Sequence, residues 1–465
     1  MRRLDTTEIK RYILLIITLA VIAYGVYESV IGYMQLFGVI PSGNSRFPVT
    51  GSFFNPGPYC GFLACILPLA ADAAISRRWK ILEYSGWIYI ILSVAMMPLL
   101  MGRTGWVAAV AGVMFVWLRE NDNLLKLKNF FLQRRSWVIA LSVAIVVFIS
   151  LFYLLKPASA SGRVFLWIIG VDAWLEHPWT GVGWEKVAGA IGLAQERYFA
   201  AHPDSVFAAV AGCPEYAFNE YLQLAIAFGA GGLLSFLILI SAGIYFSSKS
   251  RLNGVAGCWI AFAIVCMASY PLQFAEFRWS IVALCVMTVI GFKEGSRNYG
   301  SLGMASVKGI LCMSIVFAGW LLTRDMTRTN DKSRDYFDVG QSLRRIGKFD
   351  EANKEFIEGM SYSSDPMFLN MLGRNMQDMG RYEEAEKYYL RSIDRLPSRL
   401  YPRYLLAKLY ASPAYFSPDK FRRLYEETNK LEIKVSSPAV SDMQKELRQL
   451  NDSIQCLRLG LKSKR

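Results

Sequence analysis

Hydrophobic and polar positions divide the 465-residue chain into two parts. Long apolar blocks separated by short basic loops fill the first part, and densely charged sequence follows from Arg324 to the end. A helix needs about 20 mostly apolar residues to cross the hydrocarbon core of a bilayer. The pattern therefore predicts an all-α fold with a polytopic membrane domain at 1–323 and a helical tail at 324–465.

The apolar blocks also predict an orientation in the membrane. Loops expected on one side hold 17 Lys and Arg residues and the opposite loops hold 7, so the positive-inside rule predicts a cytoplasmic N-terminus. The first block lacks a small-residue cleavage site, which favours an anchor over a signal peptide. An odd number of spans then places the tail outside the cytoplasm. The nine expected spans are 12–34, 58–75, 84–101, 103–118, 137–155, 226–247, 254–270, 278–292 and 307–323.

Composition narrows the class of protein. Apolar residues make up 54% and charged residues 19%, whereas soluble proteins average about 25% charged residues. This excludes a disordered chain, a coiled coil and an ordinary soluble enzyme. The net charge of +14 does not indicate a nucleic-acid partner, because much of it lies in loops that set topology. Two histidines and the absence of CxxC spacing predict no metal site.

The tail contains an internal repeat. The segment 347–352, Gly-Lys-Phe-Asp-Glu-Ala, returns 33 residues later as Gly-Arg-Tyr-Glu-Glu-Ala at 380–385. Paired helices of about 34 residues, with Gly at the turn and Ala at the helix contact, are typical of tetratricopeptide repeats, which this tail resembles. Such a domain is either a surface that docks a protein partner or a structural cap on the membrane domain.

The longest connection in the membrane domain is an outer loop of about 70 residues at 156–225. Connections of this length are usually functional or disordered, and this one is not of low complexity. Its apolar stretch 164–175 is too short to span a bilayer and predicts a helix at the interface or re-entering it. The loop is therefore the first place to look for a site.

Four motifs occur in order along the chain. They are Gly51-Ser52-Phe53-Phe54-Asn55-Pro56, Gly102-Arg103-Thr104, the block from Ser161-Gly162-Arg163 to Trp167 together with Gly181-Val182-Gly183, and Asn219-Glu220-Tyr221-Leu222-Gln223. Their order, with the long outer loop, resembles the O-antigen ligase/polymerase family of membrane glycosyltransferases over about residues 45–290. Members of that family usually have about a dozen spans, and this chain has nine expected ones.

The resemblance implies a GT-C-like enzyme of the bacterial inner membrane, with its C-terminal domain in the periplasm. Such an enzyme moves a glycan from an undecaprenyl diphosphate carrier to an acceptor at the outer face, without a metal, a cofactor or a nucleotide sugar. The acceptor is a lipid, a growing glycan or a protein, so ligase, polymerase and protein O-oligosaccharyltransferase remain alternatives. A non-catalytic scaffold that recruits glycan-export partners through the tail is an alternative of another class.

Arginines are the candidate diphosphate-binding residues. The charge of the leaving diphosphate needs fixed cations when no metal is present, and a guanidinium offers a bidentate fork for phosphate oxygens. Arg103 and Arg163 match the functional arginines of the family by motif position, and Arg278 is a third candidate. The alternative is that each arginine anchors its helix at the lipid headgroups.

The candidate catalytic residues are Glu220 and Asn219. The family commonly has His immediately before the Asn-Glu-Tyr-Leu-Gln run, but this position is Phe218, which takes no proton. Glu220 is a substitute base for the acceptor hydroxyl, although an acid at a helix N-terminus also has a purely structural explanation. Other candidates for the base are His202, Asp204 and Glu215.

Two further features have competing interpretations. The turn 51–58 either faces the diphosphate with its backbone N–H groups or simply reverses the chain. Aromatic residues near expected span ends, such as Trp87, Trp106 and Tyr270, favour interfacial belts over sugar platforms.

Overall fold

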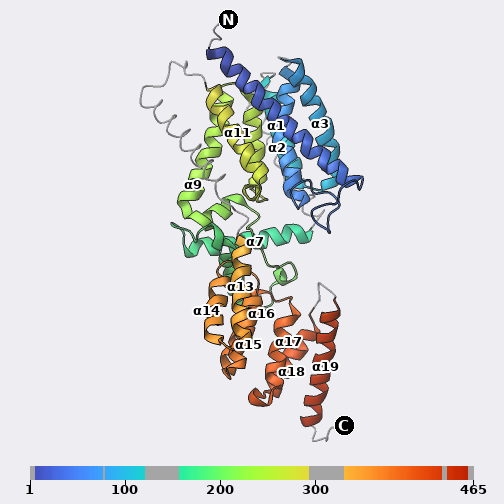
Figure 1. The fold of residues 1–465 in the computed structure, drawn as a ribbon, viewed down its shortest axis with the longest axis vertical. Helices are drawn as coiled ribbons and strands as arrows, with labels where there is room; N and C mark the ends of the chain where they lie inside the picture. Colours follow the sequence, from blue (N-terminus) through green and yellow to red (C-terminus); the bar gives the residue numbers. More distant parts are fainter. Residues whose placement is uncertain (1–5, 77–78, 121–156, 293–328, 432–436, 459–465) are drawn as a thin grey trace, which may run out of the picture. The chain divides into compact units, whose positions relative to one another are not determined.

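A computed structural model describes residues 6–76, 79–120, 157–292, 329–431 and 437–458. Every regular element in these ranges is a helix, as the sequence predicted, and no strand occurs among them. The described chain forms two compact units (Figure 1). Among the described residues, the apolar unit comprises 6–76, 79–120, 218–221 and 231–292, and the loop–tail unit comprises 157–217, 222–230, 329–431 and 437–458. Most of the outer loop therefore belongs with the tail.

The apolar unit contains the helices that can cross a membrane. Four described helices are long and apolar enough: α1 from Glu8, α2, α3 and α9. The expected spans 137–155 and 307–323, and the domain boundary after residue 323, lie outside the described residues, so the count of nine stays a prediction. The elements are α1 (Thr6–Leu36), α2 (Pro56–Ser76), α3 (Lys80–Leu100), α4 (Arg103–Glu120), α9 (Glu220–Lys249, shared between the units), α10 (Asn253–Cys266), the 3-10 helix η3 (Pro271–Gln273) and α11 (Ala275–Gly291).

Helix α2 is the centre of the apolar unit. It is buried along most of its length and packs against α3, α4 and α10. Small residues let these helices approach closely, as is common between helices in lipid. A Cβ on Gly86 of α3 would lie 2.6 Å from the Ala70 carbonyl oxygen, and one on Gly257 of α10 would lie 2.7 Å from Pro68 Cβ. These contacts fix the positions of the starts of α2 and α4, where the first and second motifs lie.

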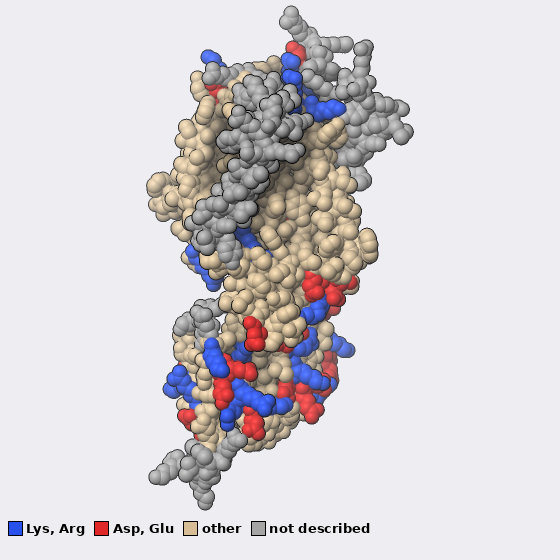
Figure 2. Space-filling view, turned by 180° about the vertical axis from the view of Figure 1, so that it is seen from behind, with Lys and Arg blue, Asp and Glu red and all other residues tan. Residues whose placement is uncertain are grey.

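The loop–tail unit joins helices from distant parts of the sequence. Among the described residues, the outer loop supplies two α-helices and two 3-10 helices, and the tail supplies seven α-helices and one 3-10 helix in series. On the face drawn in Figure 2, charged side chains gather on this unit, whereas the described surface of the apolar unit is largely uncharged. The elements are α7 (Pro157–Glu176), η1 (Trp184–Lys186), α8 (Val187–Ala201), η2 (Val206–Ala209), α13 (Thr329–Arg345), α14 (Phe349–Met360), α15 (Met367–Asp378), α16 (Tyr382–Arg395), α17 (Leu400–Ala411), η4 (Pro413–Tyr415), α18 (Pro418–Asn429) and α19 (Pro438–Arg458).

The sequence repeat of the tail is also a repeat of structure. Helices α13 and α14 form one pair, and α15 and α16 form the next. Each pair turns at a glycine with positive φ, Gly347 (φ 79°) before α14 and Gly380 (φ 75°) before α16. Ala352 and Ala385 hold equivalent positions in α14 and α16, and both are fully buried. The 33-residue spacing thus records two similar helix hairpins.

The close contact within each hairpin is testable at Gly373. A Cβ on Gly373 would lie 2.5 Å from Tyr389 Cε1, as a Cβ on Gly340 would from Phe356 Cε1 in the preceding hairpin. We expect Gly373→Val to lower the free energy of unfolding of this region by about 1–3 kcal/mol, because the added side chain overpacks the contact. The measurement is the denaturant dependence of hydrogen exchange in α15 and α16 of the full chain. Lys387→Val, at an exposed site on α16, is the control, and an equal effect of both variants would contradict the close packing.

Candidate functional site

The first motif, residues 51–56, is a turn attached to the end of α1. Gln35 Oε1 accepts hydrogen bonds from the N–H groups of Thr50 and Gly51 at 2.9 and 2.8 Å, and its Nε2 donates to the Gly51 carbonyl at 3.0 Å. The Ser52 N–H donates to Oε2 of the buried Glu28 at 3.3 Å. One side chain of α1 thus binds both the N–H and the carbonyl of Gly51, and a second binds the N–H of the next residue.

The backbone N–H groups of this turn are already used by the protein. Those of residues 50–53, 55 and 57 all donate to acceptors within the chain. Among the described residues of the turn, the Phe54 N–H, the side chains and the remaining carbonyls are left to meet a ligand. Of the two interpretations of the turn, the structure favours the one in which it reverses the chain.

An aromatic cluster attaches the turn to the start of α11. The ring of Phe53 is completely buried. Its centroid lies 5.1 Å from that of Phe62 on α2, 5.3 Å from Phe274 and 5.9 Å from Phe277 on α11. Large buried rings dominate core energetics, so this cluster sets the position of the first motif relative to residues 270–278.

The fourth motif meets the first through Tyr270. The Asn55 amide donates to the Tyr270 hydroxyl at 3.3 Å, and the Tyr270 ring contacts the Phe218 ring edge-to-face at 4.8 Å. Tyr270 is only 8% exposed, so the structure corrects its interpretation as an interfacial belt residue. Phe218 has a φ of 50°. It turns the chain into α9 with its ring against this tyrosine.

Glu220 opens α9 and is completely buried. Its Oε2 accepts a hydrogen bond from the Leu272 backbone N–H at 3.3 Å, which links the start of α9 to η3. Its Oε1 has no hydrogen-bond partner among the described residues. A buried acceptor in this state is uncommon and calls for a water, an ion or a ligand. Asn219 precedes it and is half-buried.

The second motif lies against α2 near the first motif. Met101 ends α3 with a φ of 50°, and Arg103 begins α4. Gly102 and Gly105 face Cys60, whose thiol donates to the Gly102 carbonyl at 3.4 Å, and a Cβ at either glycine would clash with it. Arg103, between these two glycines, is half-buried. The glycine contacts with Cys60 fix its position relative to Pro56, which lies four residues before Cys60 at the start of α2.

Arg278 lies in the first turn of α11, directly after the Phe277 ring that packs on Phe53. Its side chain is half-buried. The apolar unit thus holds four of the five predicted site residues, Arg103, Asn219, Glu220 and Arg278, on segments that contact one another. The roles of these residues stay predictions.

The Gly181-Val182-Gly183 turn of the third motif donates hydrogen bonds to α9 where that helix is interrupted. Gly229 leaves the helical conformation (φ 67°, ψ −164°), which frees carbonyls in the preceding turn. The N–H groups of Val182 and Gly183 donate to the carbonyls of Ile226 and Ala227, both at 2.9 Å. A Cβ on Gly181 would overlap the Ala227 backbone. Helix breaks need such partners in an apolar surrounding, so the motif has a clear structural use.

Arg163 lies on α7 of the loop–tail unit and is half-buried. Phe165, two residues on, is 1% exposed, and its ring packs against Phe199 and Phe207 with centroids 5.2 and 5.3 Å apart. Helix α7 extends beyond the predicted 164–175 at both ends. Because Arg163 and Arg103 belong to different units, their convergence on one diphosphate stays a prediction.

The other candidate bases are exposed. These are His202, Asp204 and Glu215. The His202 ring stacks on Tyr198 with centroids 4.7 Å apart, and its Nδ1 lies 2.9 Å from the Tyr198 carbonyl, which indicates a structural role. Among the described residues, no group of three or more His, Cys, Asp or Glu side chains is placed to hold a metal ion.

Comparison with known proteins supports the predicted class. Residues 88–237 match the family model described as O-antigen ligase, a range that includes Arg103, Arg163 and Glu220. No curated protein and no solved structure matches the chain at a significant level. Residues 88–237 are therefore similar to the O-antigen ligase family, and the apolar helices among the described residues agree with a membrane location.

The contact between the first and fourth motifs is testable at Tyr270. Tyr270→Phe removes the hydrogen bond to Asn55 and keeps the ring, so we expect a loss of about 1 kcal/mol in the free energy of unfolding. Tyr270→Ala also removes the ring from Phe218, and we expect a loss of about 3–5 kcal/mol. The measurement is the unfolding midpoint of the detergent-solubilised protein. Equal effects of the two variants would show that the ring is not packed as described.

Proposed function

We propose that the protein transfers a glycan from an undecaprenyl diphosphate carrier to an acceptor hydroxyl at the outer face of the bacterial inner membrane. The O-antigen ligase match at 88–237 supports the class of reaction. The observation that carries the proposal is the buried Glu220 carboxylate, whose Oε1 has no hydrogen-bond partner among the described residues. Leaving such a group without a partner costs about 1–3 kcal/mol, so a functional partner is the natural explanation.

Glu220 acts as the base in this proposal. The acceptor oxygen attacks the anomeric carbon of the carrier-linked sugar, and the bond from that carbon to the diphosphate oxygen breaks. The carrier diphosphate leaves with the electron pair, and the acceptor proton passes to Glu220 Oε1. Asn219 orients the acceptor by hydrogen bonding. The Leu272 N–H holds the other carboxylate oxygen at 3.3 Å, which leaves Oε1 to take the proton.

Three arginines meet the charge of the leaving diphosphate. Arg103 begins α4 and Arg278 lies in the first turn of α11, both in the apolar unit, and Arg163 lies in the loop–tail unit. The guanidinium fork binds two phosphate oxygens at once and keeps its charge at all relevant pH values. With these cations, the reaction as proposed uses no metal.

The proposal also includes the topology and the tail. The N-terminus is cytoplasmic, nine helices cross the inner membrane, and the tail lies in the periplasm. The tail consists of tetratricopeptide-like repeats, which the matched hairpins α13–α14 and α15–α16 support. A ligase acting on a lipid acceptor is the first choice, and a polysaccharide polymerase or a protein O-oligosaccharyltransferase is the alternative. A scaffold without catalysis is the competing class.

Substitution of the arginines tests the proposal. We expect Arg103→Lys and Arg163→Lys each to reduce transfer at least a hundredfold, because a lysine cannot reproduce the bidentate fork. Arg278→Lys should have a smaller effect of the same sign, and Glu220→Gln should abolish the proton transfer. The assay is complementation of a host lacking its own copy, with surface glycan examined on a gel and protein level by immunoblot.

The control is Arg422→Lys, whose parent residue forms an exposed ion pair with Glu426 on α18. Full activity of Arg103→Lys and Arg163→Lys would exclude catalysis at this site and favour the scaffold. A changed chain-length distribution with intact attachment would favour the polymerase.

A further inference from the structure

Helix α8 of the outer loop lies directly on the backbone of the tail. A Cβ on Gly189 would overlap the Ser361 carbonyl, and a Cβ on Gly192 would lie 2.7 Å from Ser364 Cα. Both serines belong to the connection between α14 and α15. No side chain separates the two segments at these points, so this contact depends on two glycines one helical turn apart on one face of α8.

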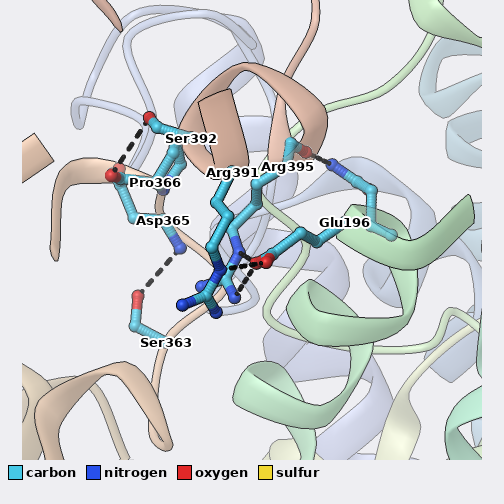
Figure 3. A network of polar contacts seen from close by, with 8 residues as sticks. Glu196, Ser363, Asp365, Pro366, Arg391, Ser392 and Arg395 are labelled. Atoms are coloured by element: carbon cyan, nitrogen blue, oxygen red, sulfur yellow. Dashed lines mark hydrogen bonds and ion pairs between the residues drawn. The ribbon is translucent and has the colours of Figure 1, made fainter. Parts of the chain in front are cut away.

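A buried ion-pair network lies next to this contact. Arg395 on α16 is 1% exposed, and its Nη2 and Nε lie 2.6 and 3.1 Å from Glu196 Oε2 on α8. Arg391 Nε donates to the other carboxylate oxygen at 2.6 Å. Figure 3 shows both arginine side chains reaching from α16 to the same carboxylate. Removing one partner would leave a buried charge uncompensated, which makes this register of α8 on the tail specific.

Gln195 connects the end of α16 to the segment 212–217, which precedes the fourth motif. Its side-chain Nε2 donates to the Arg395 carbonyl at 2.5 Å and to the Gly212 carbonyl at 3.0 Å, and the residue is 1% exposed. Five residues after Gly212, the Ala217 N–H donates to Gln223 Oε1 at 2.9 Å. Hydrogen bonds therefore join the tail to α8 and α8 to Gly212, five residues before Ala217.

A second line of contacts runs from α8 to α7. Phe165 packs its ring against Tyr198 and Phe199 of α8, with both centroids 5.2 Å away. Phe165 is two residues from Arg163 and lies on the same helix. A shift of α8 would therefore be transmitted to the helix that carries this arginine, because packed rings do not deform independently.

We propose that the tail holds the outer loop in its active arrangement, with Glu196, Gln195 and Arg395 as positioning residues for glycan transfer. The partner of this face of the tail is the outer loop of the same chain. The proposal rests on the proposed function for its activity measurement, but the contact of α8 with the tail is measured independently of it.

The test uses the full-length protein in membranes. Glu196→Gln and Arg395→Met remove the ion pair, Arg395→Lys keeps the charge, and Gln195→Met removes the bridge without leaving a buried charge. Arg381→Met is the matched control, since Arg381 forms an exposed pair with Glu384 at the start of the same helix. The measurements are hydrogen exchange in residues 187–201 and 212–217, and kcat and KM for a lipid-linked glycan donor.

We expect Glu196→Gln and Arg395→Met to speed exchange in residues 187–201 at least tenfold and to lower kcat/KM at least tenfold at normal protein level. Gln195→Met should act mainly on residues 212–217, Arg395→Lys should restore part of both effects, and Arg381→Met should match the wild type. Faster exchange with transfer within twofold of wild type would overturn the positioning role. Unchanged exchange in all variants would overturn the contact itself. A wild-type chain that keeps α8 protected but transfers no glycan would instead reject the proposed function, and the positioning role in transfer with it.

Discussion

Backbone groups that leave a helix in an apolar surrounding need hydrogen-bond partners from the protein itself. This requirement organises the region around the motifs. At the break in α9, the carbonyls of Ile226 and Ala227 receive the N–H groups of the Gly181-Val182-Gly183 turn. At the end of α1, Gln35 forms hydrogen bonds with Thr50 and Gly51, where the turn begins. Two of the four motifs thus take part in the hydrogen bonds that the backbone requires, and these bonds hold the region in which the candidate site residues lie.

The fold was largely predictable because the length of the apolar blocks and the repeat of the tail indicate its helices. The helices α1, α2, α3 and α9 follow from long apolar blocks, and the hairpins of the tail follow from a 33-residue repeat. The outer loop was less accessible to sequence reasoning. Helix α8 contains two glycines and has no strong apolar stripe, so the apolar periodicity of its sequence gives little signal of a helix. The structural role of its glycines, which is to allow close contact with the tail backbone at residues 361–364, is seen only in the structure.

The candidate site was predictable in part for a similar reason. Arg103 and Glu220 stand out because charges are rare beside apolar blocks, and both lie at helix starts in the structure. Tyr270 gave no such signal. Aromatic residues near span ends usually mark the interface, and only the contacts with Asn55 and Phe218 show that this one is part of the packing. Pairings between residues far apart in sequence are not encoded in local periodicity.

The contact between Glu196 and Arg395 has a consequence for biosynthesis. The two residues are separated by 199 positions, so α8 leaves the ribosome long before its partner exists. At about 5–20 residues per second, the delay is roughly 10 to 40 seconds. During that interval the glycine face of α8 and the Glu196 carboxylate have no tail to cover them. A chain truncated before α16 never forms this contact, so the outer loop reaches its final structure only after α16 has been synthesised.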